Sequence, residues 1–168
     1  MKPASSFTLV ELMLVVSIIT ILAAVSLPTF TGFQKSQTLN DSAKKLKSDL
    51  RYIQNKSLSS VNGKAWGVHL TNNSSSYQFF YCTPNSLSYE EYLFSVTSRC
   101  TGSTVISFTS PAVVIRTSTF SDIVFDNLNG TLVADGSLPV GDLTINVAYA
   151  DGSASKTVTL GRGGRIEE

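Results

Sequence analysis

The chain has 168 residues, with 13 Lys and Arg against 12 Asp and Glu, so its formal net charge is +1. This overall charge gives no reason to expect a polyanion as a partner, and a single histidine excludes a metal site built from several histidines. Hydrophobic residues make up 42% of the chain, enough for one globular domain with its own core beyond the apolar start.

The chain opens with a nearly continuous apolar run, residues 7–30, that contains one charged residue, Glu11. About 20 apolar residues suffice to cross a bilayer, so this run is predicted to be a transmembrane helix. Lys2 precedes it and favours a cytoplasmic N-terminus. The run is longer than the apolar region of a cleaved secretory signal and holds an acid, so a retained anchor is the better interpretation. A carboxylate inside such a helix costs about 3 kcal/mol at mid-membrane and needs a reason.

A second helical pattern follows the apolar run. Pro28 removes a backbone donor, so we expect a kink near this residue. Beyond it, apolar residues at spacings of three and four predict an amphipathic helix, and this stripe comprises Leu39, Ala43, Leu46, Leu50 and Ile53. Asn62-Gly63 supplies a stop. The sequence therefore predicts one helix from about Phe7 to about Val61, with a lipid-facing half over 7–30 and an amphipathic half over 31–62.

Residues 63–168 consist of short alternating or β-branched stretches separated by turn signals, which indicates antiparallel strands. The predicted strands are Ala65–Leu70, Ser76–Cys82, Tyr92–Thr97, Thr104–Thr109, Val113–Thr117, Asp122–Phe125, Leu143–Tyr149 and Ser155–Leu160. Asp151-Gly152 lies between the last two strands and predicts a tight hairpin. The fold class is therefore α+β, with a long N-terminal helix whose amphipathic half covers one face of an antiparallel β-sheet or small β-sandwich.

Charge is unevenly distributed beyond the apolar run. Residues 31–64 carry a net charge of +5, and residues 65–168 carry a net charge of −4. One interpretation is that the two parts attract each other or the oppositely charged parts of neighbouring copies. The other is that they form two ordinary solvated faces.

Few side chains point to chemistry. Cys82 and Cys100 are the two cysteines; in an oxidising compartment they are expected to form a disulfide, and the alternative is a pair of free buried thiols. His69 is the sole histidine, and the sequence contains no Gly-x-Ser-x-Gly motif. We therefore assign no catalytic residue, no metal and no cofactor, and we expect that the protein is not an enzyme.

The residues Ser6-Phe7-Thr8-Leu9-Val10-Glu11-Leu12 resemble the class III signal of type IV pilins and type II secretion pseudopilins. The resemblance implies a leader of residues 1–6, which a prepilin peptidase removes between Ser6 and Phe7 before Phe7 is methylated. Ser6 stands where the family has glycine. The resemblance also implies that Glu11 pairs in the membrane with the amino group of Phe7, on its own or a neighbouring chain, and that Pro28 lets the helix bend during filament packing. The alternative for Glu11 is an acid that lies at the membrane interface, and the alternative for Pro28 is a simple kink at the membrane surface.

Residues 43–57 resemble the end of the helix in the GspH/FimT group of minor pilins and pseudopilins, and residues 157–166 resemble the last strand of that group. This resemblance implies a structural minor subunit of a type IV pilus or type II secretion filament. It implies a single-pass protein of the bacterial inner membrane with a periplasmic domain, residues 63–168, which lies in or at the tip of a filament after assembly. The implied partners are other pilin or pseudopilin subunits, the prepilin peptidase and the inner membrane.

Two other functions stay open. Arg162 and Arg165 on a flexible, Gly-rich tail could contact the phosphates of DNA, as some DNA-uptake pilins of this group are thought to do. A solvated strand end is the favoured interpretation of these arginines. The alternative of another class is a membrane-anchored binding domain or enzyme that never polymerises, but a plain anchor gives no reason for the acid at Glu11.

Overall fold

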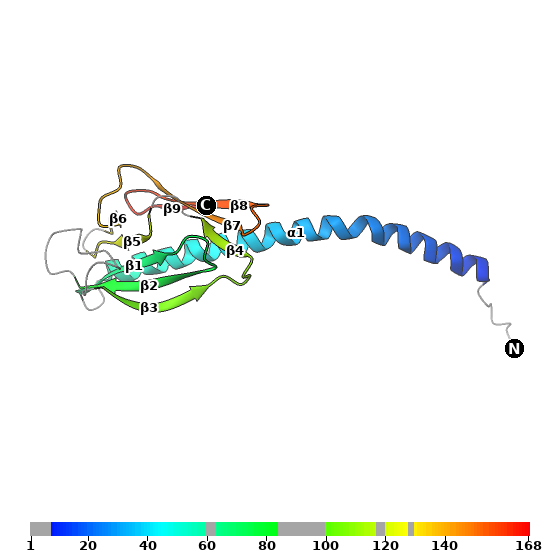
Figure 1. The fold of residues 1–168 in the computed structure, drawn as a ribbon, viewed down its shortest axis with the longest axis horizontal. Coiled ribbons are helices and arrows are strands. Elements are labelled where there is room, and N and C mark those ends of the chain that lie inside the picture. The colour runs from blue at the N-terminus through cyan, green and yellow to red at the C-terminus, as the bar shows by residue number, and fades with distance from the viewer. Residues whose placement is uncertain (1–7, 60–62, 84–99, 117–119, 128–129) are drawn as a thin grey trace. The chain divides into compact units, whose positions relative to one another are not determined.

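The computed structural model describes residues 8–59, 63–83, 100–116, 120–127 and 130–168, with the backbone alone for residues 25–29 and 103. These residues form one long helix followed by β-strands (Figure 1). The chain divides into two compact units, Met1–Gln37 and Thr38–Glu168. Helix α1, Leu9–Leu58, begins in the first unit and ends in the second.

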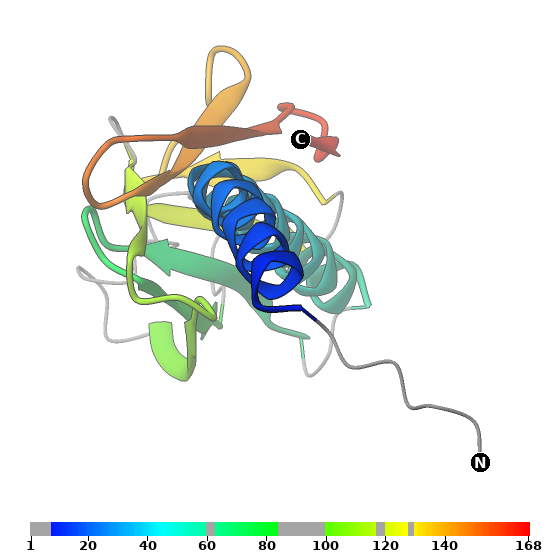
Figure 2. The same cartoon turned by 90° about the vertical axis from the view of Figure 1, so that its right-hand side faces the viewer.

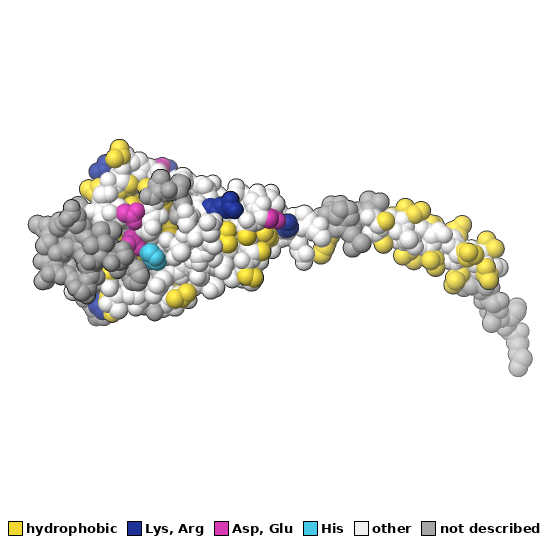
Figure 3. All heavy atoms as spheres, viewed as in Figure 1, with side chains coloured by type: hydrophobic (Ala, Val, Ile, Leu, Met, Phe, Trp, Pro, Cys, Tyr) yellow, Lys and Arg dark blue, Asp and Glu magenta, His cyan; other side chains and the backbone are white. Residues whose placement is uncertain are grey.

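The first unit contains the N-terminal part of α1, which exposes apolar side chains all round between Leu9 and Leu22. Its large aliphatic side chains between Leu9 and Leu22 are 45–74% exposed, and Figure 3 shows apolar side chains along this part of the helix. A helix that is hydrophobic all round normally has its surface covered, by a large core, a membrane or other helices. Among the residues that the structure describes, no helix combines the length and the hydropathy required to cross a membrane.

The second unit contains the rest of α1 and two antiparallel sheets. The five-stranded sheet has the order β3-β2-β1-β5-β6, and the four-stranded sheet has the order β4-β7-β8-β9. The strands are β1 (Ala65–Leu70), β2 (Ser76–Cys82), β3 (Cys100–Ser107), β4 (Val113–Arg116), β5 (Asp122–Phe125), β6 (Leu132–Ala134), β7 (Leu143–Tyr149), β8 (Ser155–Leu160) and β9 (Ile166–Glu167). Seen nearly along α1, strands of both sheets lie beside the helix (Figure 2).

The apolar stripe of α1 forms one core with both sheets. Its members, Leu39, Ala43, Leu46, Leu50 and Ile53, are each at most 4% exposed. They pack with inward side chains such as Val68 of β1, Ile145 of β7 and Val158 of β8 in a single cluster. Full burial of one such side chain contributes about 2 kcal/mol. The stripe therefore gives the helix its place against the sheets, as its spacing predicts.

The opposite face of the five-stranded sheet carries a second, smaller apolar cluster, which consists of Ala65, Phe80, Cys82, Val124 and Val133. Gly67 lies on this face. A Cβ atom at this position would lie 2.6 Å from the carbonyl oxygen of Ile123 and 2.8 Å from the Phe80 ring. The close approach of β5 and the Phe80 ring therefore requires a residue without a side chain.

The structure confirms the predicted α+β class and changes several details. As predicted, one helix continues through position 28, but α1 ends at Leu58, three residues before the predicted end. The hairpin between β7 and β8 is confirmed, with Gly152 at a φ of +73°. The predicted strand Tyr92–Thr97 lies outside the described residues. The prediction missed β6 and β9 because strands of three and two residues are too short to show an alternating pattern.

Candidate assembly and binding sites

Glu11 lies in the first turn of α1, where Thr8 caps its backbone. The backbone N–H of Glu11 donates to the hydroxyl oxygen of Thr8 at 3.3 Å. Thr8 is therefore the N-cap, and Glu11 occupies the third helical position, as in the capping box S/T-x-x-E. The sequence Thr8-Leu9-Val10-Glu11 carries this signal, which the sequence analysis did not use. A carboxylate in this first turn also complements the positive end of the helix dipole.

Two polar side chains in the apolar part of α1 are satisfied by the helix itself. The Ser17 hydroxyl donates to the carbonyl oxygen of Met13 at 2.8 Å, and the Thr20 hydroxyl donates to that of Val16 at 2.8 Å. Polar groups that face hydrocarbon must find partners within the protein. The helix itself therefore provides the partners of these two hydroxyls.

Several predicted site residues lie wholly or partly outside the described residues. Ser6 and Phe7, the predicted cleavage and methylation positions, are not among them, and only the backbone of Pro28 is described. The predicted transmembrane span, residues 7–30, includes both Phe7 and Pro28 and is therefore only partly described. The roles of Ser6, Phe7, Glu11 and Pro28 therefore stay predictions.

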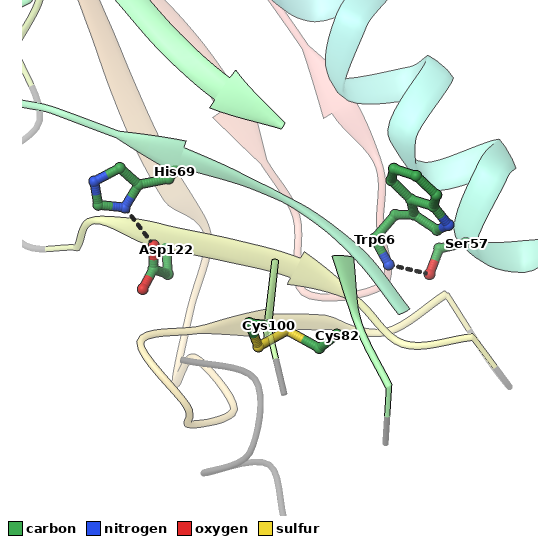
Figure 4. The surroundings of a disulfide bond; sticks show 6 residues. All are labelled: Ser57, Trp66, His69, Cys82, Cys100 and Asp122. Carbon is green, nitrogen blue, oxygen red and sulfur yellow. Dashed lines mark hydrogen bonds and ion pairs between the residues drawn. A yellow bond between two sulfur atoms is a disulfide. The ribbon is translucent and has the colours of Figure 1, made fainter. Parts of the chain in front are cut away.

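Cys82 and Cys100 form the expected disulfide. Their Cα atoms are 4.1 Å apart, and the residues are separated by 18 positions in the sequence. The bond joins the end of β2 to the start of β3 (Figure 4). The disulfide thus links the edge strand β3 of the five-stranded sheet to its neighbour β2, and Cys82 is itself buried in the smaller apolar cluster.

The end of the chain is held against α1 and does not form the expected flexible tail. Gln54 donates through Nε2 to the carbonyl oxygen of Gly164 at 2.8 Å, and Arg51 donates to that of Ile166 at 3.2 Å. Ile166 is buried, and Lys156 bonds both to the Asn40 side chain at 2.7 Å and to Glu168 at 2.9 Å. Residues 164–168 thus run antiparallel to α1, as a clasp over its amphipathic half. These contacts join residues more than 100 positions apart, so no local sequence pattern reveals them.

The two candidate DNA-binding arginines are exposed at this end, and among the described residues an ion pair engages one of them. Arg165 forms an ion pair with Glu167 at 3.4 Å. Arg162 lies in the turn that follows β8, and its backbone carbonyl accepts a hydrogen bond from Leu132. Two exposed arginines, one of them paired with a neighbouring acid, resemble a solvated strand end, the favoured sequence interpretation.

His69 and Asp122 form a polar pair that sequence analysis missed. The His69 Nδ1 atom lies 2.6 Å from Asp122 Oδ1, between paired positions of β1 and β5 (Figure 4). The hydrogen bond to Asp122 raises the pKa of His69, against partial burial, which lowers it, and the charges of Asp122 and Asp135 add to the rise. Figure 3 shows this histidine beside acidic side chains. Since the partners are 53 residues apart, only strand pairing brings them together.

Polar side chains also fasten the end of α1 to the sheets. The buried Ser57 hydroxyl donates to the carbonyl oxygen of Phe125 and accepts the backbone N–H of Trp66 at 3.1 Å (Figure 4). The Tyr77 hydroxyl donates to Asp49 at 2.5 Å. Burial is the main cause that raises the pKa of Tyr77, and the bond to Asp49 adds to it. These contacts fix the rotation of the helix as well as its position.

Two lysines near the end of α1 lie over aromatic rings. Lys56 Nζ is 3.6 Å from the centroid of the Trp66 ring, and Lys64 Nζ is 3.7 Å from that of the Tyr81 ring. The Trp66 and Tyr81 rings are themselves 5.1 Å apart. Because the ammonium groups cover these faces, the rings are engaged within the domain. In the part of the chain that the structure describes, no group of three or more His, Cys, Asp or Glu side chains is placed to hold a metal ion.

Comparison with known proteins identifies a family motif at the N-terminus. Residues 1–27 match the family described as "prokaryotic N-terminal methylation motif". The match supports the pilin class, as the N-terminal resemblance implies, and a motif of this type implies prepilin peptidase processing, inner-membrane anchoring and assembly with other pilin subunits. Neither the comparison with curated proteins nor the comparison with solved structures finds a match.

Proposed function

We propose that this protein is a structural minor pilin or pseudopilin of the GspH/FimT type, a subunit of a type IV pilus or type II secretion filament. The observation that carries the proposal is the match of residues 1–27 to the methylation motif. The all-round apolar surface of α1 between Leu9 and Leu22 supports it, because that surface needs a membrane before assembly and other helices after it. The class that this motif marks is structural rather than enzymatic.

In this proposal the chain inserts once into the inner membrane, and its β-rich domain lies in the periplasm. Removal of residues 1–6 frees the amino group of Phe7. Glu11 then pairs with that group, on its own or a neighbouring chain, and the pair offsets the cost of taking a carboxylate out of water. The contact favours a defined axial offset between successive helices.

The mass of the mature protein tests the processing step. We expect the chain to lose residues 1–6 and to gain one methyl group on Phe7, as measured by mass spectrometry of the N-terminal peptide. An intact leader would favour the membrane-anchored domain that never polymerises.

Substitutions at Glu11 separate the role of its charge from the role of its side chain in the first turn of the helix. Gln keeps a side chain of similar size and shape but carries no charge, whereas Ala removes both. If Glu11 pairs with an amino group, Glu11→Gln and Glu11→Ala should both lose incorporation into filaments while membrane insertion persists. If the charge of Glu11 has no role in assembly, Glu11→Gln should assemble normally, and that result contradicts the proposed pair.

A matched control is available on the same helix. Asp41 is exposed on the amphipathic half of α1, so Asp41→Ala also removes one carboxylate. We expect Asp41→Ala to assemble like the wild type, as measured by the amount of the subunit in sheared filaments. A comparable loss in Asp41→Ala would show that incorporation responds to the charge of the helix and not to Glu11.

A further inference from the structure

Phe33 is the last apolar residue of the first unit, and its side chain is exposed. Phe33 is 65% exposed, and Phe30, one helical turn earlier, is 60% exposed. Residues 34–38 are all polar, and the next apolar residue along α1 is Leu39, which is buried in the stripe. The chain therefore changes from apolar to polar directly after Phe33.

Glu11 and Phe33 stand at the two ends of an uncharged part of α1, since no charged residue occurs between Glu11 and Lys35. At the rise of an α-helix, residues 12–33 extend over about 33 Å, close to the roughly 30 Å of hydrocarbon in a bilayer. Residues 9–33 extend over about 37 Å, which is less than the roughly 40–45 Å of a bilayer with its headgroups. A helix with residues 12–33 in the hydrocarbon thus keeps its apolar side chains within the bilayer.

This placement differs from the predicted span, residues 7–30. A helix centred on that span has Glu11 about 4 Å inside the hydrocarbon and Phe33 about 7 Å outside it. The first costs free energy because a carboxylate loses water, and the second exposes an aromatic ring to a polar layer. Centring the helix on residues 12–33 brings both side chains to the boundary between headgroups and hydrocarbon, which suits an apolar ring and a hydrated charge.

The polar side chains that this placement puts in the hydrocarbon support it. Ser17 and Thr20 both donate to carbonyl oxygens of their own helix. The helix of a subunit that has not yet assembled is surrounded by lipid, and the helices of neighbouring subunits replace that lipid only in the filament. The bilayer is therefore the occupant of the exposed surface of Phe33 at this stage.

We propose that, before assembly, the Phe33 ring lies at the headgroup boundary of the periplasmic leaflet and the Glu11 carboxylate lies at that of the cytoplasmic leaflet. Glu11 then stays hydrated in the membrane and loses its water only when the subunit enters the filament. The inference rests on the proposed function, which supplies the membrane.

Tryptophan fluorescence in proteoliposomes tests this placement. The full-length chain receives one additional tryptophan at an exposed position of the first unit, in four variants: Leu12→Trp, Ile21→Trp, Phe33→Trp and Gln37→Trp. The phospholipids are brominated either near the headgroup end of their acyl chains or near the methyl end, because bromine quenches tryptophan only at short range. The wild-type chain, whose one tryptophan is the buried Trp66, gives the signal to subtract.

We expect the tryptophans at positions 12 and 33 to be quenched at least about twofold more by bromine near the headgroups, because about 15 Å separates that level from the bilayer centre. At position 21 the bromine near the methyl ends should quench more. Gln37→Trp is the matched control, since it places the same ring about 6 Å further along the helix. Its quenching should fall to the level of the wild type.

The outcomes separate this inference from the function on which it rests. If position 21 is quenched but position 33 is quenched no more than position 37, Phe33 lies in water, so the inference is wrong and the membrane anchor stands. Stronger quenching of position 12 by bromine near the methyl ends also overturns the inference, because Glu11 would then lie in the hydrocarbon. If neither lipid quenches position 21, the helix does not span the bilayer, and the proposed function and this inference are both wrong.

Discussion

Gly164 lies at the centre of the clasp between the end of the chain and α1, and replacing it should weaken that contact. Its φ is +83°, a region that residues with a side chain rarely adopt. A Cβ at this position would lie 2.3 Å from Gln54 Nε2 and 3.0 Å from the carbonyl oxygen of Gly130. In Gly164→Ala the flexible Gln54 side chain must therefore move away, and its hydrogen bond to the Gly164 carbonyl is lost.

The expected loss follows from these two effects. A left-handed backbone costs an alanine roughly 1 kcal/mol, and the lost hydrogen bond costs about 1 kcal/mol. We therefore expect Gly164→Ala to lower the free energy of unfolding by about 2 kcal/mol, which corresponds to a Tm decrease of about 6 °C for a chain of this size. Gly163→Ala is the matched control, because nothing lies within 4 Å of a Cβ there.

The assay is thermal and urea unfolding of the full chain in detergent micelles, followed by circular dichroism. Gln54→Ala should lose about 1 kcal/mol by itself, and adding it to Gly164→Ala should cost little beyond the loss in Gly164→Ala alone, since both remove the same hydrogen bond. If Gly164→Ala and Gly163→Ala unfold within about 0.5 kcal/mol of each other, the clasp contributes nothing measurable and the reasoning is wrong.

Two further predictions concern the sheets. The raised pKa of His69, caused first by its hydrogen bond to Asp122, means that protonated His69 stabilises the folded state. This stabilisation is complete below about pH 6.5, the pKa of an unfolded histidine, and it is lost as the pH rises through the folded pKa. Urea unfolding between pH 5.5 and 8.5 should show that the free energy of unfolding declines as the pH rises, and His69→Gln should flatten this pH dependence. NMR titration of the single histidine gives its pKa in the folded protein directly, and a folded pKa below 6.5 contradicts the prediction. Replacing Cys82 and Cys100 by serine opens a loop that spans 18 positions and should cost about 3 kcal/mol by the chain-entropy estimate, measured by urea unfolding against the oxidised wild type; equal stability of the two proteins would show that the bond does not constrain the unfolded chain.

The parts of the fold that depend on local pattern could be predicted from sequence. The spacing of the stripe from Leu39 to Ile53 reports directly which face of the helix is buried, and all five of its residues are buried. The Asp151-Gly152 hairpin was also predictable, because a glycine at positive φ is a local requirement. Both signals lie within a few residues of the feature that they predict.

The missed features depend on contacts between distant residues. Nothing near His69 indicates that Asp122 will lie beside it, and nothing near Gly164 indicates that Gln54 will bond to its carbonyl. The Gly-rich end was therefore expected to be flexible, although Ile166 anchors it in the core. The cap at Thr8 is a different case, because its signal is local. Thr8 stands three residues before Glu11, which is the spacing of an N-cap, but the prediction considered Glu11 only for its charge in the membrane.

The clasp also determines how the domain resists force. Residues 164–168 run antiparallel to α1, so a pull along the helix axis acts on the bonds from Arg51 and Gln54 at the same time, in shear. For the helix to slide, these bonds must fail together with the buried stripe and with the bonds from Ser57 and Asp49 to the five-stranded sheet. In a subunit that is held by its helix, tension would therefore reach both sheets at once: the four-stranded sheet through β9 and β8, and the five-stranded sheet through β2 and β5.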